Sequence, residues 1–131
     1  MVLKVVCAVI EDKGTVLITQ RSESMPEPLL WEFPGGKMEP GETEEACLHR
    51  EIGEELSLTI RVVSRMTPVR HLLPTGTWLE LIPYRCTRTG GQLILSEHKA
   101  YRWCLPAELR RYTWCHPDVP IVEAYLGKAD F

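Results

Sequence analysis

The segment from Gly35 to Leu58, GGKMEPGETEEACLHREIGEELSL, constrains the fold more than any other part of this 131-residue chain. Its first part carries a Gly-Gly pair and a Pro-Gly turn, which predict breaks in regular structure. Thr43 then provides a good helix N-cap, and Glu44 and Glu45 place negative charge in the first turn, where the helix dipole favours it. We therefore predict a helix from about Thr43 to Leu56.

One face of the predicted helix is crowded with carboxylates. Glu51, Glu54 and Glu55 fall within about one third of its circumference. Like charges at these spacings repel, so each pair destabilises the helix by a few tenths of a kcal/mol unless a cation lies among them. Carboxylate and carbonyl oxygens are the ligands that Mg²⁺, Mn²⁺ and Ca²⁺ prefer, and Gly35 and Gly36 allow a close approach of the backbone. The pattern indicates a divalent-cation site; the alternative is a solvated acidic helix after a glycine turn.

The rest of the chain predicts a mixed β-sheet on which the apolar face of this helix packs. Apolar, β-branched runs bounded by turn residues predict strands at Val2–Ile10, Thr15–Gln20, Leu30–Phe33, Leu58–Met66 and Thr77–Cys86, and Leu93–Leu95 and Ala100–Cys104 are further short apolar runs between turn signals. Pro83 predicts that the fifth of these strands is an edge strand or contains a bulge. Short helices are predicted at Pro106–Arg111 and Pro120–Leu126. Strands and helices do not alternate regularly, so the fold class is α/β in the broad sense, and α+β more narrowly.

Length, charge and cysteine content exclude several classes of protein. We expect one domain spanning residues 1–131, without a membrane span, because no apolar run approaches about eighteen residues. The formal net charge of −3 argues against duplex nucleic acid as a partner. Five cysteines without a C-x-x-C pair are interpreted as reduced thiols, which favours a cytoplasmic protein. Both a monomer and a homodimer are compatible with the sequence.

The segment from Gly36 to Leu58 also resembles a family signature, the Nudix box. The box reads Gly-x5-Glu-x7-Arg-Glu-U-x-Glu-Glu-x-Gly-U, where U is a bulky aliphatic residue. Its positions are occupied here by Gly36, Glu42, Arg50, Glu51, Ile52, Glu54, Glu55 and Leu58. Ser57 departs from the pattern, because it stands at the second glycine. A serine in the left-handed conformation costs on the order of 1 kcal/mol, so either Ser57 adopts that conformation or the chain leaves the helix differently.

The resemblance extends to most of the chain. Leu30–Lys37 resembles the approach to the box in the MutT-type branch, which hydrolyses nucleoside triphosphates to monophosphate and pyrophosphate. Glu97–Cys104 and Pro117–Ile121 are similar to the C-terminal part of bacterial CTP pyrophosphohydrolases. The resemblance implies the Nudix fold, a mixed sheet sandwiched between helices (α/β/α).

The resemblance also implies a metal site and a set of catalytic groups. The implied ligands of Mg²⁺, or of Mn²⁺, are Gly36, Glu51, Glu54, Glu55 and Glu97. Water would attack a phosphorus of the triphosphate, with Glu54 or Glu97 as the base. Arg50 would orient Glu51 or Glu54, and Glu42 would support the loop before the helix. The alternative for Glu97 is an exposed charge in a strand connection.

The resemblance implies that the nucleotide is contacted by Arg21, Phe33, Gly35 and Asp118. Asp118 stands where MutT-type proteins place a base-reading side chain, and an aspartate there accepts a hydrogen bond from an exocyclic amine. As an alternative, Asp118 is a helix N-cap, because it lies two residues before Pro120. The base stays open between cytosine nucleotides, such as CTP, dCTP or modified forms, and an oxidised purine such as 8-oxo-dGTP.

We therefore predict a metal-dependent nucleoside triphosphate pyrophosphohydrolase with a role in nucleotide sanitation and DNA repair. The alternatives are a Nudix-like nucleotide-binding module without catalysis and a hydrolase of another nucleoside diphosphate derivative. A domain whose acidic helix is merely structural predicts that Mg²⁺ leaves the melting temperature unchanged.

Overall fold

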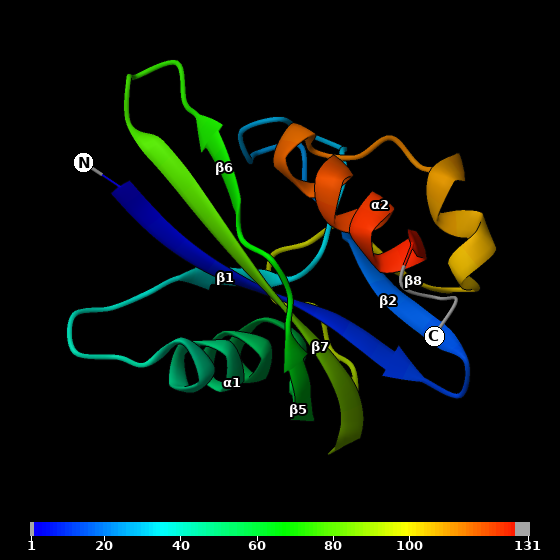
Figure 1. The fold of residues 1–131 in the computed structure, drawn as a ribbon. Helices are drawn as coiled ribbons and strands as arrows, with labels where there is room; N and C mark the ends of the chain where they lie inside the picture. Colours follow the sequence, from blue (N-terminus) through cyan, green and yellow to red (C-terminus); the bar gives the residue numbers. More distant parts are fainter. Residues whose placement is uncertain (1, 128–131) are drawn as a thin grey trace.

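A mixed β-sheet of eight strands forms the centre of the molecule, and helices cover both of its faces (Figure 1). The computed structural model describes residues 2–127. The strands are β1 (Val2–Asp12), β2 (Thr15–Gln20), β3 (Trp31–Glu32), β4 (Gly35–Lys37), β5 (Leu58–Arg65), β6 (Val69–Leu72), β7 (Trp78–Gly91) and β8 (Ala100–Cys104). The helices are α1 (Glu44–Leu56) and α2 (Val119–Gly127), with 3-10 segments η1 (Pro106–Arg111) and η2 (His116–Asp118). The predicted α+β class and the sheet between helices are confirmed.

The long strands β1 and β7 lie side by side at the centre of the sheet. They pair in parallel from Val2 opposite Trp78 to Glu11 opposite Thr87, whereas the other strand pairs are antiparallel. A tight turn joins β1 to β2, with positive φ at Lys13 and Gly14, as a two-residue β-hairpin turn requires.

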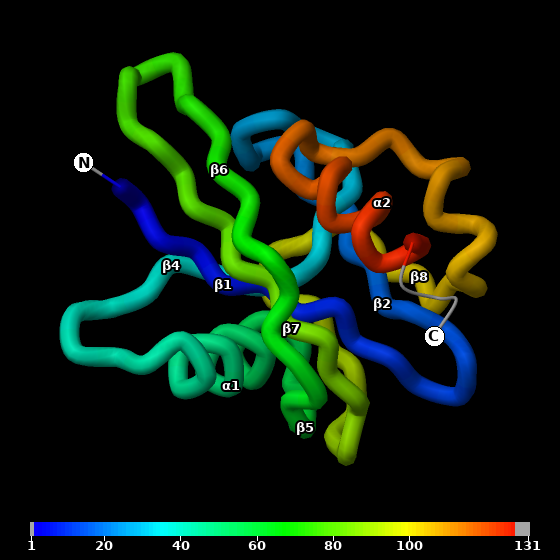
Figure 2. Tube along the Cα trace, in the orientation of Figure 1, coloured from blue at the N-terminus to red at the C-terminus, as the bar shows by residue number. Residues whose placement is uncertain are grey.

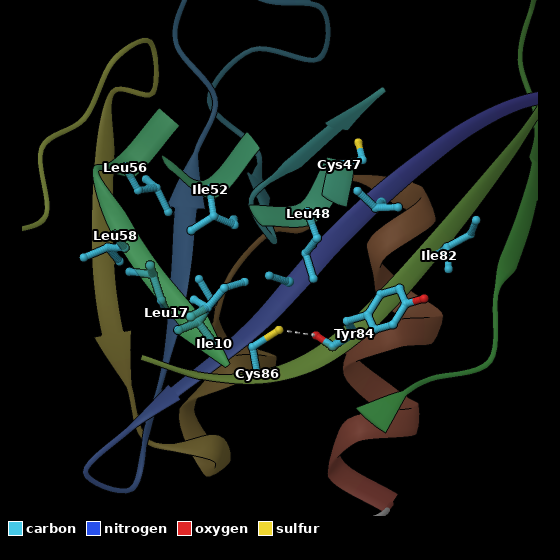
Figure 3. Close-up of a cluster of buried hydrophobic side chains, with 13 residues drawn as sticks. Ile10, Leu17, Cys47, Leu48, Ile52, Leu56, Leu58, Ile82, Tyr84 and Cys86 are labelled. Atoms are coloured by element: carbon cyan, nitrogen blue, oxygen red, sulfur yellow. Dashed lines mark hydrogen bonds between the residues drawn. The ribbon is translucent and has the colours of Figure 1, made fainter. Parts of the chain in front are cut away.

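Alternation along β1 divides the core into two layers. Val6, Ala8 and Ile10 face α1 and pack with its apolar stripe, the layer that Figure 3 shows. Cys7 and Val9 face the other way and pack with α2 and η1. A strand buried on both faces reads as a continuous apolar run, which is why Val2–Ile10 lacks a polar alternation. All five cysteines are buried free thiols, as predicted.

Of the two alternatives predicted from Pro83, the bulge agrees with a register shift in the pairing of β7 with β5, between Val62 and Ser64, but the edge strand is wrong. Pro83 lies in the central strand β7, opposite Cys7 of β1. On its other side β7 changes partner, pairing with β6 up to Leu81 and with β5 from Tyr84. Pro83 occupies the interruption, where its carbonyl accepts a hydrogen bond from Met66 N, so its missing N–H removes no ladder bond.

The predicted break at the Gly-Gly pair is also wrong, because these residues form β4. Figure 2 shows β4 running beside β1, and Gly35 and Gly36 lie opposite Cys7 and Val6. A Cβ atom on Gly35 would lie 1.9 Å from the Val6 carbonyl oxygen, so the strand needs a glycine to come this close. The sequence analysis also did not identify β6, and the predicted helix at Pro106–Arg111 is a 3-10 segment.

Helix α1 begins and ends as its sequence predicts. The Thr43 hydroxyl accepts a hydrogen bond from Ala46 N at the N-terminus. At the C-terminus Ser57 adopts the left-handed conformation, with φ 57° and ψ 32°, and its N–H donates to Gly53 O. The first of the two alternatives for Ser57 is therefore correct. Within residues 2–127, no helix is long and apolar enough to span a membrane.

Candidate active site

The acidic face of α1 packs directly on the backbone of β4. A Cβ atom on Gly36 would lie 2.2 Å from the carboxyl carbon of Glu51, well inside van der Waals contact. The glycine that the box pattern requires therefore makes room for the glutamate that the same pattern requires fifteen residues later. This contact brings the Gly36 backbone beside the first carboxylate of the predicted metal site.

Arg50 joins α1 to the loop that precedes it. Its guanidinium donates two hydrogen bonds to Glu42, at 2.6 and 2.9 Å, one to Glu51 Oε1 at 2.9 Å and one to the Lys37 carbonyl at 3.2 Å. The bidentate partner is thus Glu42, whereas Glu54 Oε2 lies 3.4 Å away and its side chain is largely exposed. The hydrogen bonds from Arg50 lower the pKa of Glu42 to about 2. Arg50 therefore fixes Glu51 and the entry to the helix together.

Glu55 is the most electrostatically strained carboxyl of the helix. Its pKa is raised to about 9, first by burial and then by the neighbouring Glu51 carboxylate, with smaller contributions from Glu32 and Glu97. A buried carboxyl beside other carboxylates keeps its proton unless a cation compensates the charge. The environment of Glu55 is therefore the kind that a divalent cation would relieve.

The loop after β7 is held against the C-terminus of α1. Ile94 N donates to Leu56 O at 2.9 Å, and Ser96 N donates to Glu55 O at 3.0 Å, which satisfies two free carbonyls of the helix end. Lys99 N donates to Gln20 O on β2. Anchored at both ends, the loop carries Glu97 and His98 to the acidic face of α1.

These elements enclose an open cleft of about 460 Å³. It is lined by Arg21, Met25, Glu32, Gly35, Gly36, Lys37, Glu51, Glu54, Glu55, Ser96, Glu97 and His98. All five predicted metal ligands are in this set, together with the predicted substrate contacts Arg21 and Gly35. Arg50 and Glu42 are not among the lining residues, and neither are Phe33 and Asp118.

Phe33 and Asp118 meet in the core on the α2 side. The Asp118 carboxylate is 5% exposed and accepts a hydrogen bond from Phe33 N at 3.0 Å, 85 residues away in sequence. This bond comes from β3–β4 rather than from the first turn of α2, where the N-cap alternative would place it. Burial raises the pKa of Asp118 to about 8, so below that pH the carboxyl holds a proton and can donate as well as accept.

Glu32 and His98 of the cleft were not predicted as site residues by the sequence analysis. Glu32 accepts a hydrogen bond from Arg21 Nη1 at 2.8 Å through one oxygen and contacts His98 Nε2 at 2.8 Å through the other. His98 is buried and forms part of the cleft wall. The sequence feature that could have identified Glu32 is its position between two aromatic residues, Trp31 and Phe33, in a predicted strand.

The donor chemistry of the cleft fits a divalent cation. Across residues 2–127, no set of three or more His, Cys, Asp or Glu side chains is already arranged to hold a metal ion. The cleft nevertheless gathers the Glu51, Glu54, Glu55 and Glu97 carboxylates near the Gly36 backbone, all oxygen donors. This set of oxygen donors favours Mg²⁺ or Mn²⁺ over metals that prefer nitrogen or sulfur. A bound cation would also offset the cost of ionising the buried Glu55 carboxyl.

Comparison with known families agrees with this geometry. The model of the NUDIX domain matches residues 2–125. The chain belongs to the Nudix family. This Nudix chain is 34% identical over 125 residues to a CTP pyrophosphohydrolase of Escherichia coli K12, an alignment covering 95% of this chain and 92% of that protein.

Two further relatives place the chain in the same branch. It is 36% identical over 104 residues to a putative 8-oxo-dGTP diphosphatase 2 of Mycobacterium tuberculosis, covering 79% of this chain and 74% of that one. The structure matches that of a MutT protein from Methanosarcina mazei Go1 with a TM-score of 0.87 and 25% identity, over 99% of this chain and 96% of that chain. The predicted membership of the MutT-type branch is confirmed, and the chain is a Nudix hydrolase.

Proposed function

We propose that this Nudix hydrolase converts a nucleoside triphosphate and water to the nucleoside monophosphate and pyrophosphate, with Mg²⁺ or Mn²⁺ as the cofactor. The observation that carries the proposal is the cleft itself. It combines a carboxylate cluster on α1 with Arg21 on the opposite wall, so it offers both a cation site and an anion contact. A triphosphate bridged by a divalent cation matches this distribution of charge.

The residues divide the chemistry among them. Glu51, Glu54, Glu55, Glu97 and the Gly36 carbonyl would hold the metal, which when bound neutralises phosphate charge and lowers the pKa of the attacking water. Glu54 or Glu97 takes the proton from that water. Both side chains line the cleft, and that of Glu54 is 60% exposed. Arg50 keeps Glu51 oriented through the 2.9 Å hydrogen bond.

Arg21 is the proposed phosphate contact. Its Nε and Nη1 atoms are held by Pro26 O and Glu32, which fixes the plane of the guanidinium at the cleft wall. A guanidinium oriented in this way presents its remaining N–H groups to a phosphate oxygen without a further loss of side-chain freedom.

For the base, we propose a cytosine nucleotide, CTP, dCTP or a modified form, in line with the name of the relative that aligns with 95% of the chain. The second candidate is 8-oxo-dGTP, which the name of the mycobacterial relative favours. Phe33 and Asp118 are kept as the proposed base contacts, although both are buried and lie outside the lining of the cleft. A modified cytosine nucleotide or 8-oxo-dGTP as the substrate would give the protein a role in nucleotide sanitation and DNA repair in the cytoplasm. We also propose that the protein acts as one domain, as a monomer or a homodimer, and that duplex nucleic acid is not its partner.

A competition assay over canonical, methylated and oxidised triphosphates tests the proposal. We expect Mg²⁺-dependent pyrophosphate release, with one cytosine nucleotide consumed first from an equimolar mixture. Glu54→Gln and Glu55→Gln should each lose most of this activity at unchanged fold. Tight nucleotide binding without turnover would instead favour the non-catalytic module, and turnover confined to nucleotide sugars or dinucleotides would favour a different substrate class.

A further inference from the structure

His98 occupies an unusual position for a loop residue. Its side chain is 3% exposed, whereas the side chains of Glu97 and Lys99 beside it are accessible. The ring lies between two carboxylates that belong to different parts of the fold, Glu32 on β3 and Glu55 on α1. The imidazole is therefore a packed part of the cleft wall and the point where β3 and α1 come together.

The two ring nitrogens have different surroundings. Nε2 lies 2.8 Å from Glu32 Oε2, and because a carboxylate accepts, this nitrogen donates. Glu32 Oε1 in turn holds Arg21 Nη1 at 2.8 Å, so His98, Glu32 and Arg21 form one chain of hydrogen bonds.

The other nitrogen, Nδ1, is buried and has no hydrogen-bond partner within residues 2–127. Its nearest charged atom is Glu55 Oε2 at 3.6 Å, just beyond hydrogen-bond length. A buried polar atom without a partner costs about 1–3 kcal/mol, so its retention calls for an explanation. Nδ1 points at the largely buried Glu55 carboxyl of α1, and a small movement of Glu55 would complete the contact.

We propose that His98 is a positioning residue that joins the Arg21–Glu32 pair to Glu55, so that the phosphate-binding and carboxylate walls of the cleft keep one relative geometry. The inference rests on the proposed function, because it assigns a task to a side chain of that same cleft. His98 does not contact the reacting atoms; it acts on Arg21 through Glu32 and on Glu55 directly.

Two conservative substitutions separate the two contacts. In His98→Gln the amide nitrogen reaches the place of Nε2 and can donate to Glu32, but no polar atom replaces Nδ1. In His98→Asn the amide occupies the place of Nδ1 and faces Glu55, but it is too short to reach Glu32. His98→Ala removes both contacts, and His49→Gln, on the exposed side of α1, is the matched control.

The positioning role predicts opposite effects of the two substitutions. His98→Asn should raise KM for the nucleotide about tenfold with little change in kcat, because the Arg21 wall is released. His98→Gln should lower kcat about tenfold and weaken Mn²⁺ binding, measured by calorimetry without nucleotide, with little change in KM. His98→Ala should show both defects, and His49→Gln neither.

Other outcomes would overturn the inference. If the Asn and Gln variants show the same defect, or if all three variants lose melting temperature alone while KM, kcat and Mn²⁺ affinity stay at the wild-type values, His98 is merely structural. Failure of the proposed function is a separate result, namely a wild-type protein that does not release pyrophosphate. The Mn²⁺ titration still decides the role of His98 in that case, because an unchanged affinity in His98→Gln contradicts it.

Discussion

Gly36 has little freedom to change, because the space a side chain would need is filled by the Glu51 carboxylate. Arg50 holds that carboxylate from the other side. Gly53, about one turn after Arg50 on α1, provides a contrast to Gly36, because a Cβ atom on Gly53 would meet no atom within 4 Å. Two glycines of the same segment therefore have different reasons to be present.

Replacing Gly36 by alanine should displace Glu51 and reduce pyrophosphate release by about a hundredfold, since misplacing a catalytic group by about 1 Å has effects of this size. Gly53→Ala, in an exposed helix interior, should keep full activity and raise the free energy of unfolding by about 1 kcal/mol. Steady-state kinetics and urea unfolding of both variants measure the contrast. Near wild-type turnover in Gly36→Ala would show that the close contact with Glu51 is unimportant.

Ser57 adopts the left-handed conformation without any described contact that needs a serine side chain. Its hydrogen bond to Gly53 O uses only the backbone N–H. Ser57→Gly should therefore raise the free energy of unfolding by up to about 1 kcal/mol, because glycine adopts φ 57° without steric cost. Urea denaturation measures the change, with Ser64→Gly on the exposed end of β5 as a control that should lose stability. A destabilised Ser57→Gly would contradict this reading of the helix end.

At the scale of elements, the site depends on how the loop at residues 92–99 is attached to α1. Its two amide hydrogen bonds to Glu55 O and Leu56 O use carbonyls that a free helix end leaves unsatisfied. The same loop therefore caps the helix and sets the position of Glu97. If Glu97 acts as proposed, catalysis should depend on the exit geometry of α1 through these bonds.

Ile94→Pro tests this coupling, because it removes the N–H that donates to Leu56 O while the side chain is already 59% exposed. We expect kcat to fall about tenfold with a smaller change in KM, since the loop that carries Glu97 and His98 loses one anchor. Ile94→Ala keeps the N–H and should retain activity. Equal effects of the two substitutions would mean that the side chain, not the anchor, matters.

The elements also show what can be predicted from sequence. Helix α1 was predicted within one residue, because capping and the apolar stripe are local signals. The central place of β7 and the existence of β4 were missed, because strand pairing depends on contacts far apart in the chain, such as Cys7 with both Gly35 and Pro83. The carboxylates of one helix face were found by spacing, whereas the contact between Glu32 and His98 joins residues 66 positions apart and leaves no local pattern.

For the molecule as a whole, two buried carboxyls make stability depend on pH in the same direction. The pKa values of Asp118 and Glu55 are raised to about 8 and about 9 in the folded state, so folding retains protons that the unfolded chain releases near pH 4. Their contribution to stability is complete below about pH 4 and is lost progressively as the pH rises through 8 and 9.

Without metal, the melting temperature of the wild-type protein should therefore fall more between pH 5 and pH 9 than that of Asp118→Asn. The asparagine keeps an acceptor for Phe33 N. Thermal unfolding in EDTA across this range measures the effect. Added Mg²⁺ should flatten the part that Glu55 contributes, because a cation lowers its pKa. A pH dependence identical in wild type and Asp118→Asn would show that Asp118 is not protonated in the folded state.

The identity of the products, and their dependence on metal, decide whether this cleft hydrolyses a nucleoside triphosphate to monophosphate and pyrophosphate. ³¹P NMR of CTP or dCTP incubated with the protein and Mg²⁺ should show one pyrophosphate for each monophosphate formed, with no reaction in EDTA and little in Glu55→Gln. Release of orthophosphate in place of pyrophosphate, or turnover undiminished by EDTA, would contradict the assignment of this cleft to metal-dependent pyrophosphohydrolysis.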